Sequence, residues 1–184
     1  MSGRVVVLAS GEGTNVQALL DSGLPVVVVG SDKPRARALA RAEAAGAATV
    51  VNRDLARWGE ILAPYKPDVV VLAGFMRILP DAFVLSHDCI NVHPSLLPAF
   101  PGLRAAEQAL AYGVKVTGCT VHYVDTGVDT GPIILQAAVP VRAGDTADSL
   151  HARIQVEEHR LLPEAVRLHL AGRLRKNGRH VEVI

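Results

Sequence analysis

A regular alternation of short apolar runs with helical patterns in the first 75 residues is the feature that most constrains the fold. The apolar runs are residues 4–9, 25–30, 48–51 and 68–73. The helical patterns between them are residues 15–21, 34–45 and 55–65. Such alternation is typical of βαβ units around a parallel sheet, and strands this continuously apolar are expected where helices cover both faces. The N-terminal half is therefore predicted to be a doubly wound α/β fold.

The second half of the chain changes character. Residues 115–124 and 132–141 are long strand candidates joined by a short loop, which predicts an antiparallel, hairpin-like pair. Residues 146–171 carry apolar residues at a helical period, with Asp145 or Thr146 available as N-cap. The basic residues 160–180 are expected to form the solvated end of this helix rather than a nucleic-acid patch. The prediction for the whole chain is a Rossmann-like, mostly parallel sheet with an antiparallel strand pair in the C-terminal half.

Composition narrows the class of protein. A chain of 184 residues with 49% hydrophobic residues fits one domain, and 19 Lys plus Arg against 18 Asp plus Glu provide no overall charge that would attract nucleic acid. No run reaches the ~20 apolar residues of a membrane-spanning helix, and the N-terminus is a poor signal peptide, so a cytoplasmic protein without a membrane partner is expected. Cys89 and Cys119 are expected to be buried in strands, without a disulfide or a zinc site.

A glycine-rich stretch, SGEGTN from Ser10 to Asn15, follows the first expected strand and opens the first helix. Glycines expose backbone N–H groups and a helix N-terminus adds partial positive charge, so the stretch predicts a phosphate site. The dinucleotide fingerprint needs a third glycine where Val16 stands. Asp32 stands where a ribose-binding acid would lie, so a dinucleotide site remains an alternative. A tight turn that binds no ligand is the other alternative.

Polar side chains end another strand-like stretch, at residues 88–98. Residues two apart in a strand point to the same face, so Asn91 and His93 are expected to converge at the carboxyl end of that strand, where open α/β sheets bind ligands. Asn supplies a neutral donor, and His gives or takes a proton near pH 7. Such a strand end is, taken alone, more often structural. Ser95 is expected to be a loop-capping hydroxyl and not a nucleophile.

A loop with the sequence DTGVDTG, residues 125–131, joins the two long strand candidates. Its glycines allow Asp129 to take an unusual backbone conformation and to face inward. An aspartate beside His93 would favour the charged form of the histidine. Without Asn91 and His93, an ordinary turn aspartate is the simpler interpretation.

These stretches together make the chain resemble the phosphoribosylglycinamide formyltransferases of the formyltetrahydrofolate-using superfamily. The segments that carry the resemblance are, in the family's order, SGEGTN, VVVLAGFMRIL, INVHPSLLPAFPG and VDTGVDTGPIILQ. They extend from Ser10 to about Glu158, and only HPSLLP is shared with the wider superfamily. The resemblance implies one formyltransferase domain over residues 1–184, with a phosphate-binding half at 1–75 and a folate-binding and catalytic half at 76–184.

The resemblance implies a reaction without a metal. The formyl group of 10-formyltetrahydrofolate would pass to the amine of 5'-phosphoribosylglycinamide, a step of purine (IMP) biosynthesis. Asn91, His93 and Asp129 match the family's catalytic trio. Asn91 and protonated His93 would hydrogen-bond the oxyanion that forms during attack, and Asp129 would keep His93 charged.

The resemblance also assigns residues to the two small-molecule substrates. Those carried over to the ribonucleotide are Gly13, Thr14, Asn15, Gln155 and Glu158. Those carried over to the folate are Met76, Arg77, Ile78, Leu79, Asn91, Asp125, Thr126, Gly127, Val128 and Asp129. Residues 52–67 are shorter than in many members, and Arg57 is the candidate there for an arginine that contacts folate. The resemblance further suggests a cis Leu97–Pro98 peptide, and a monomer or a homodimer.

Two alternatives remain open. A formyltetrahydrofolate deformylase would use the same trio with water in place of the amine, but it normally carries an N-terminal regulatory domain, whereas the first expected strand starts at Arg4. A non-catalytic nucleotide-binding module would have no need of an intact trio. An activity assay distinguishes the formyltransferase from these two alternatives.

Overall fold

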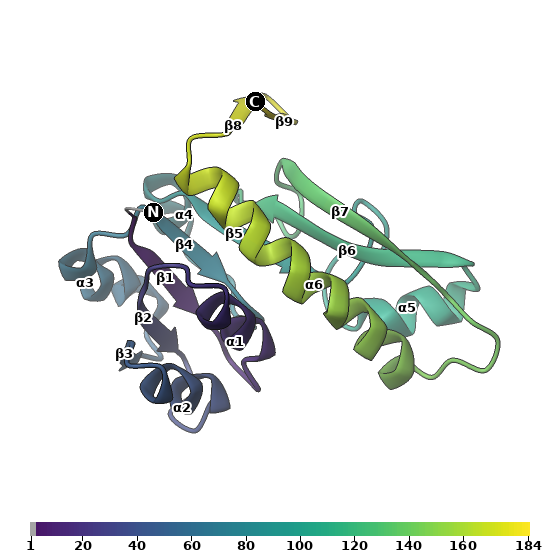
Figure 1. Cartoon of the computed structure of the whole chain (residues 1–184), viewed down its shortest axis with the longest axis horizontal. Helices are drawn as coiled ribbons and strands as arrows, with labels where there is room; N and C mark the ends of the chain where they lie inside the picture. The colour runs from purple at the N-terminus through teal and green to yellow at the C-terminus, as the bar shows by residue number, and fades with distance from the viewer. Residues whose placement is uncertain (1–2) are drawn as a thin grey trace.

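The computed structural model describes residues 3–184 and contains a seven-stranded sheet in the order β3-β2-β1-β4-β5-β6-β7 (Figure 1). The strands are β1 (Val5–Leu8), β2 (Val26–Ser31), β3 (Ala48–Val51), β4 (Val69–Leu72), β5 (Cys89–His93), β6 (Val116–Tyr123) and β7 (Ile133–Pro140). Strands β1 to β5 are parallel, whereas β6 pairs antiparallel with β5 and β7 with β6. The mostly parallel α/β sheet with an antiparallel pair is thereby confirmed.

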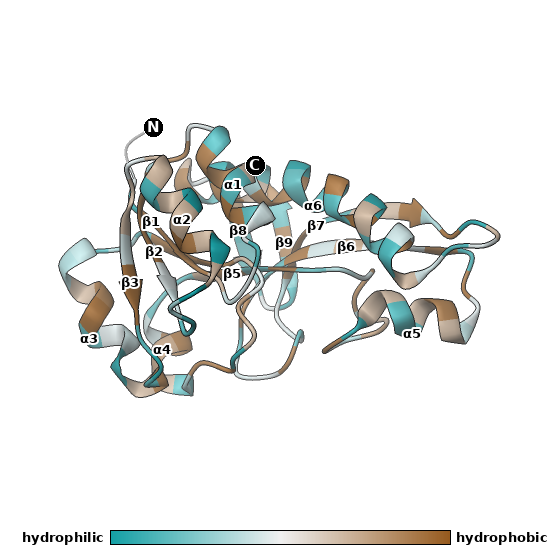
Figure 2. Ribbon diagram, turned by 90° about the horizontal axis from the view of Figure 1, so that it is seen from below, coloured by the Kyte–Doolittle hydropathy of each residue, from teal (hydrophilic) through white to brown (hydrophobic). Residues whose placement is uncertain are grey.

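Helices cover both faces of this sheet. They are α1 (Thr14–Asp21), α2 (Arg37–Ala44), α3 (Trp58–Leu62), α4 (Asp81–Ser86), α5 (Ala105–Tyr112) and α6 (Ala147–Leu170), with short 3₁₀ turns η1 (Leu55–Arg57) and η2 (Ala63–Tyr65). Figure 2 shows α1, α2 and α6 on one side of the sheet, and α3 and α4 on the other. The sequence analysis did not predict α4 and α5.

Alternation along each strand explains why the apolar runs are continuous. Val5 and Val7 of β1 pack into the apolar cluster under α1, α2 and α6. Val6 and Leu8 point the other way, into the cluster that contains Trp58 of α3. All of these side chains are fully buried, so neither face of β1 has a position for a polar residue.

Two helix predictions need correction at their ends. The helix expected over residues 34–45 begins only at Arg37, because Ala36 before it has an extended backbone. The helix expected over residues 55–65 is instead η1, α3 and η2 in succession. Pro64, inside η2, lacks the N–H that an α-helix would need there, so α3 stops at Leu62.

The prediction for residues 160–180 was wrong in part. Helix α6 ends at Leu170, and the chain then forms a small antiparallel hairpin of β8 (Leu174–Asn177) and β9 (His180–Val183). Gly172 and Gly178 have positive φ angles of 65° and 58°, which allow the chain to leave the helix and to turn between the strands. The basic side chains of this segment are exposed on the hairpin.

Helix α6 packs across the sheet and begins at a capping box. Its N-cap is Thr146, one of the two predicted caps, whose hydroxyl accepts from the Ser149 amide at 3.2 Å while the Ser149 hydroxyl accepts from the Thr146 amide at 3.0 Å. Leu150 and Ile154 on its buried face join the core. The helix also lies against α1, so it connects the two halves of the chain.

Both cysteines are buried and free, as predicted, and burial raises the pKa of each thiol to about 12. Between residues 3 and 184, none of the helices has the length and apolar composition needed to cross a membrane. The same residues contain no group of three or more His, Cys, Asp or Glu side chains placed to hold a metal ion.

Candidate active site

The register of the parallel strands brings three predicted segments to one edge of the sheet. Leu8 of β1 is paired with Leu72 of β4, and Leu72 with Asn91 of β5. The glycine-rich loop after β1, residues 73–79 after β4, and the polar end of β5 therefore leave the sheet at neighbouring positions. Carboxyl ends of parallel strands are the usual ligand-binding edge of such folds.

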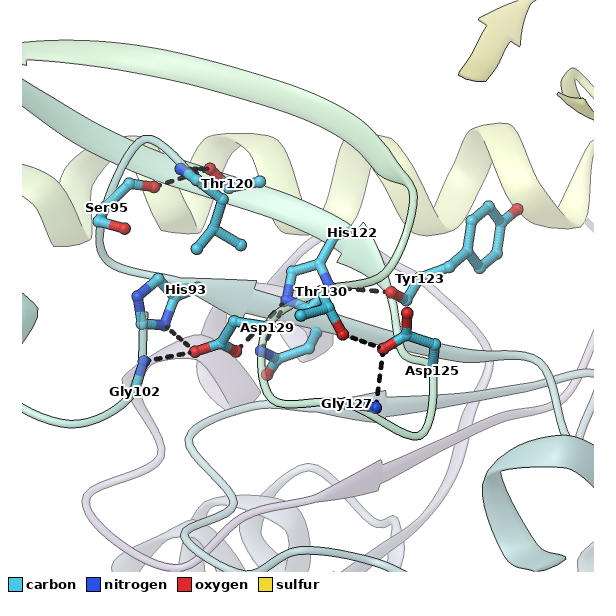
Figure 3. Close-up of polar contacts among 12 residues, drawn as sticks. His93, Ser95, Gly102, Thr120, His122, Tyr123, Asp125, Gly127, Asp129 and Thr130 are labelled. Carbon is cyan, nitrogen blue, oxygen red and sulfur yellow. Dashed lines mark hydrogen bonds and ion pairs between the residues drawn. The ribbon is translucent and has the colours of Figure 1, made fainter. Parts of the chain in front are cut away.

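His93 and Asp129 of the predicted trio meet at this edge (Figure 3), and Asn91 joins them through His122. The Nδ1 atom of buried His93 lies 3.2 Å from Oδ2 of Asp129. The same carboxylate oxygen accepts a hydrogen bond of 2.7 Å from the Gly102 amide. Asn91 and His93 are two residues apart in β5, so their side chains lie on the same face of that strand.

Asp129 takes the unusual backbone conformation that its flanking glycines predict. Its φ is 54°, in the left-handed region that non-glycine residues seldom adopt. A side chain at Gly131 would lie 1.8 Å from the Tyr123 carbonyl oxygen, so that position must be glycine. Asp125 braces the loop by accepting from the Gly127 amide at 3.1 Å and the Thr130 hydroxyl at 2.6 Å. The loop thus aims one carboxylate at His93.

Opposing effects act on the Asp129 carboxyl. Partial burial raises its pKa, but nearby His122, whose Nε2 lies 3.7 Å from Oδ1, the hydrogen bond from the Gly102 amide and the positive charge of His93 together outweigh this effect. The net pKa lies below its ordinary value. Asp129 is therefore a carboxylate, able to hold a positive charge beside it, at any pH near neutrality.

The second ring nitrogen of His93 is also occupied. Nε2 lies 2.8 Å from the carbonyl oxygen of Phe100, and a carbonyl only accepts, so Nε2 carries hydrogen. Nδ1 then faces the Asp129 carboxylate as a hydrogen-bond donor only if it is protonated too. The arrangement therefore suits an imidazolium ring held between Asp129 and Phe100.

His122 is a buried member of this cluster to which the sequence analysis assigned no role. Its Nδ1 lies 2.8 Å from the Tyr123 carbonyl oxygen and its Nε2 lies 3.1 Å from Nδ2 of Asn91. Donation from Nδ1 to the carbonyl leaves Nε2 free to accept one N–H of Asn91. Asn91 and His122 are direct partners in the β5–β6 ladder. Pairing the strand that contains Asn91 with the strand predicted at residues 115–124, in antiparallel register, would have placed His122 opposite Asn91.

A buried polar network fixes the loop that follows β5. Thr120 of β6 donates its hydroxyl to the Ser95 carbonyl at 2.7 Å and accepts from the Leu97 amide at 3.0 Å (Figure 3). The Ser95 hydroxyl caps the loop at the Ala99 carbonyl, as predicted. The Leu97–Pro98 peptide is cis. This network holds the segment whose Phe100 carbonyl contacts His93.

The glycine-rich loop lies at the N-terminus of α1. Gly13 is the residue before α1 and has φ 72°, and a Cβ there would lie 2.6 Å from Cα of Ala38, so only glycine fits. Thr14 is half-buried at the first position of the helix, and Asn15 follows, buried. Backbone N–H groups and side-chain donors at a helix N-terminus can bind a phosphate.

Asn15 and Glu158 meet across the two halves of the chain. Nδ2 of Asn15 donates to Oε2 of Glu158 at 3.0 Å, although 143 residues separate them. Burial raises the pKa of Glu158, and the Asn15 hydrogen bond and the charge of His151 only partly oppose this. Oδ1 of Asn15 is buried and has no hydrogen-bond partner among residues 3–184. Gln155 lies one turn earlier on α6, half-buried.

The segment after β4 is tied to the glycine-rich loop. Ser10 donates its hydroxyl to buried Asp32 at 2.6 Å and accepts from the Met76 amide at 2.9 Å. Arg77 lies 3.9 Å from the other Asp32 oxygen. The Asp32 carboxylate is thus engaged by this chain's own residues, which argues against its binding the ribose of a dinucleotide.

The predicted folate residues of this segment differ in exposure. Met76 and Ile78 are 59% and 74% exposed, whereas Leu79 is buried in the cluster under α3 and α4. Arg57 lies in exposed η1, paired with Glu60 at 3.2 Å. The next residue, Trp58, packs edge-on against Phe75 with ring centroids 6.2 Å apart, so Arg57 is adjacent in sequence to a residue that contacts the segment after β4. The contact of Arg57 with folate stays a prediction.

Comparison with known proteins yields a family and several close likenesses. The formyl transferase family model matches residues 3–166. The trifunctional purine biosynthetic protein adenosine-3 of Bos taurus is 46% identical over 195 residues, which cover 96% of this chain and 19% of that protein. This chain therefore spans about a fifth of the bovine protein's length.

Other likenesses extend over nearly the whole of both chains. The phosphoribosylglycinamide formyltransferase of Mycobacterium tuberculosis is 44% identical over 203 residues, covering 98% of this chain and 94% of that protein. The crystal structure of glycinamide ribonucleotide transformylase 1 from Symbiobacterium toebii has a TM-score of 0.96 and 48% identity, covering 99% of this chain and 94% of that one. By its sequence and by its fold, this chain belongs to the formyl transferase family.

Proposed function

We propose that this chain is a phosphoribosylglycinamide formyltransferase of purine (IMP) biosynthesis. It transfers the formyl group of 10-formyltetrahydrofolate to the amine of 5'-phosphoribosylglycinamide and releases formylglycinamide ribonucleotide and tetrahydrofolate. The observation that carries this proposal is the convergence of Asn91, His93 and Asp129 at the ligand-binding edge of the sheet. The names of the relatives support the same reaction.

The chemistry is an acyl transfer that these side chains suit. The substrate amine attacks the formyl carbon, a C–N bond forms, and the carbonyl oxygen becomes an oxyanion. Asn91 and protonated His93 donate hydrogen bonds to that oxygen, which lowers the barrier because the donors are already oriented. The bond from carbon to the folate nitrogen then breaks, and the proton lost by the amine ends on that nitrogen, with Asp129 assisting its passage.

Two observations favour this division of roles. His122 takes one N–H of Asn91, which leaves the second N–H for the oxyanion. Both nitrogens of His93 already have acceptors, in Asp129 and Phe100, so the formyl oxygen has to replace one of them in the reactive complex. We expect it to replace the Phe100 carbonyl, because loss of the ion pair with Asp129 would cost more than loss of a neutral acceptor.

The two substrates flank the trio. The ribonucleotide phosphate binds at Gly13, Thr14 and Asn15, with Gln155 and Glu158 contacting the rest of that substrate. The folate lies against residues 76–79 and against the backbone of residues 125–129, with Arg77 available to its glutamate tail. A flat heteroaromatic ring is well served by an apolar slot with a few backbone donors and acceptors.

A spectrophotometric assay of tetrahydrofolate release tests the proposal. Purified protein is mixed with 10-formyltetrahydrofolate, with and without 5'-phosphoribosylglycinamide. Release that requires the ribonucleotide is the expected result. Release at the same rate without it would identify a deformylase, and no release in either mixture, together with ribonucleotide binding by calorimetry, would identify a binding module.

A further inference from the structure

The C-terminal hairpin contacts the loop that carries Asp129. Arg179, in the turn between β8 and β9, donates from Nη1 to the carbonyl oxygen of Thr130 at 3.0 Å. Thr130 is the residue directly after Asp129, and its hydroxyl donates to Asp125 at 2.6 Å. Thr130 is therefore held at two points. Its hydroxyl is bound by Asp125 of the same loop, and its carbonyl oxygen is bound by Arg179 of the hairpin.

The hairpin is itself anchored to the body of the protein. Leu174 of β8 and Val181 of β9 are partly buried against the apolar cluster that lies under α6. The ammonium group of Lys176 stands 5.2 Å from the centre of the Tyr123 ring, a cation–π distance. The Tyr123 hydroxyl in turn lies 2.9 Å from Nδ1 of His169, near the end of α6. The turn with Arg179 is thus a fixed point for the loop.

A cavity of about 540 Å³ separates the loop and the hairpin from the end of α4. The residues that line it include Val84 and His87 on one side, Val124 and Asp125 from the start of the loop, and Arg179 from the hairpin. A loop beside an open cavity lacks packed side chains on that side, and segments with few packing contacts open locally at low cost. The hydrogen bond from Arg179, which lines this cavity on the hairpin side, to Thr130 limits such movement.

We propose that Arg179 is a positioning residue for Asp129, an inference that rests on the proposed function. Asp129 holds a left-handed backbone, which persists only where the surroundings fix it. The Gly102 amide fixes its carboxylate from the front, at 2.7 Å. Arg179 fixes the carbonyl group of the next residue, Thr130, at 3.0 Å. Loss of either contact lets the carboxylate drift from Nδ1 of His93.

The test compares Arg179→Met and Arg179→Lys with a control in the same hairpin, Arg175→Met. Arg175 pairs with Glu182 across the two strands, so its replacement perturbs the hairpin surface without removing a bond to the loop. Amide hydrogen exchange of residues 125–131 is measured by mass spectrometry in the absence of substrates. Turnover, both KM values and the thermal midpoint are measured in parallel.

Arg179→Met is expected to increase exchange in residues 125–131 and to lower kcat by about three- to tenfold, as for loss of one charge-assisted bond near the surface. The KM for the folate rises, while the KM for the ribonucleotide and the thermal midpoint stay at the values of Arg175→Met. Arg179→Lys, which keeps a donor, restores part of the turnover. A general loosening of the fold would instead move the midpoint and both KM values.

Two results would overturn the inference. If exchange of residues 125–131 is the same in Arg179→Met and in Arg175→Met, the hairpin does not hold the loop. If exchange increases but kcat and the folate KM match the control, the contact exists without positioning Asp129. Failure of the proposed function is a separate observation, because it would appear as an absence of formyl transfer in the wild-type protein, and the exchange comparison would still decide the contact.

Discussion

The glycine-rich loop of residues 10–15, proposed to bind phosphate and called here the phosphate loop, lies at the same edge of the sheet as the proposed catalytic cluster around Asn91, His93 and Asp129, yet the two backbones are constrained differently. In the phosphate loop the residue with positive φ is Gly13, at 72°. In the catalytic cluster the residues with positive φ include Phe100 at 53° and Asp129 at 54°, and both have side chains. In the proposed function the first region presents mainly backbone groups to a phosphate, whereas the second has to present a carboxylate.

This difference follows from what each region has to supply. Glycine adopts the left-handed conformation freely, so a site that needs N–H groups can use it at little cost. A residue that must keep its side chain there costs of order 1–3 kcal/mol, which the surroundings have to offset. At Asp129 the offset comes from the Gly102 amide and the His93 ring, and at Phe100 from the same His93. Contacts within the cluster therefore support both backbones, and the proposed role of Arg179 adds support for Asp129 from outside it.

The largest expected effect comes from Asp129→Asn. The amide keeps the size of the side chain, but it cannot stabilise the charge of His93, so kcat is expected to fall by about 10²- to 10⁴-fold. Both KM values and the thermal midpoint should change little. Steady-state kinetics and thermal unfolding provide the check, and Asp125→Asn in the same loop is the control for loop geometry. Turnover close to wild type would remove Asp129 from the mechanism.

Gly13→Ala in the phosphate loop should show the opposite pattern to Asp129→Asn, because it lowers stability and ribonucleotide binding and largely spares kcat. A Cβ at this positive φ would lie 2.6 Å from Cα of Ala38, so the unfolding free energy is expected to drop by about 2 kcal/mol, or about 4–8 °C in thermal midpoint. The KM for the ribonucleotide rises while kcat at saturation is largely kept. Gly11→Ala is the matched control, because a Cβ there meets nothing within 4 Å. Equal effects of the two variants would contradict the role of Gly13.

His122→Phe tests whether the orientation of Asn91 matters. Phenylalanine fills the same buried space but cannot accept a hydrogen bond from the Asn91 amide. The Asn91 side chain therefore loses the contact with His122 that orients it. We expect kcat to fall about tenfold, with little change in either KM. Kinetics of His169→Phe, which removes a partly buried histidine near β6, provide the control. A value of kcat equal to that control would show that Asn91 is oriented without His122.

The smallest expected effect is a gain in stability with Glu158→Gln. Burial raises the pKa of Glu158 above its ordinary 4.5, so the stability its neutral form contributes is present below that pH and is lost as the pH rises through the folded-state pKa. Glutamine does not ionise. The thermal midpoint of the variant should therefore exceed that of wild type by about 2–4 °C at pH 8 and by less at pH 4.5. Glu157→Gln, at a more exposed neighbour, should show no such trend with pH.

The sequence predicted most of what depends on local pattern. The six predicted strand segments, residues 4–9, 25–30, 48–51, 68–73, 115–124 and 132–141, each overlap one strand of the sheet. The pattern is readable because the central strands β1 and β4 are buried along their whole length, whereas the edge strands β3 and β7 are more exposed. The N-cap of α6 and the unusual backbone conformation of Asp129 were predicted equally well, because each depends on a few adjacent residues.

What the sequence analysis missed depends on contacts between distant residues. The role of His122 appears only once β6 is paired with β5, 31 residues away. The engagement of Asp32 by Ser10 depends on the meeting of two loops, and the same residue viewed alone suggested a ribose-binding acid. Helices α4 and α5, of six and eight residues, lie outside the strand–helix alternation of residues 4–73 that indicated α1 and α2, which are themselves only eight residues long.

The uninterrupted course of α6 has a consequence for how chains of this family can vary in length. The helix runs for 24 residues, roughly 36 Å, and carries Glu158 to Asn15. Each residue inserted between its capping box and Glu158 would rotate the carboxylate by about 100° around the helix axis and break that meeting. Insertions and deletions are therefore expected to accumulate in the connecting loops, while the distance in residues from Thr146 to Glu158 remains constant.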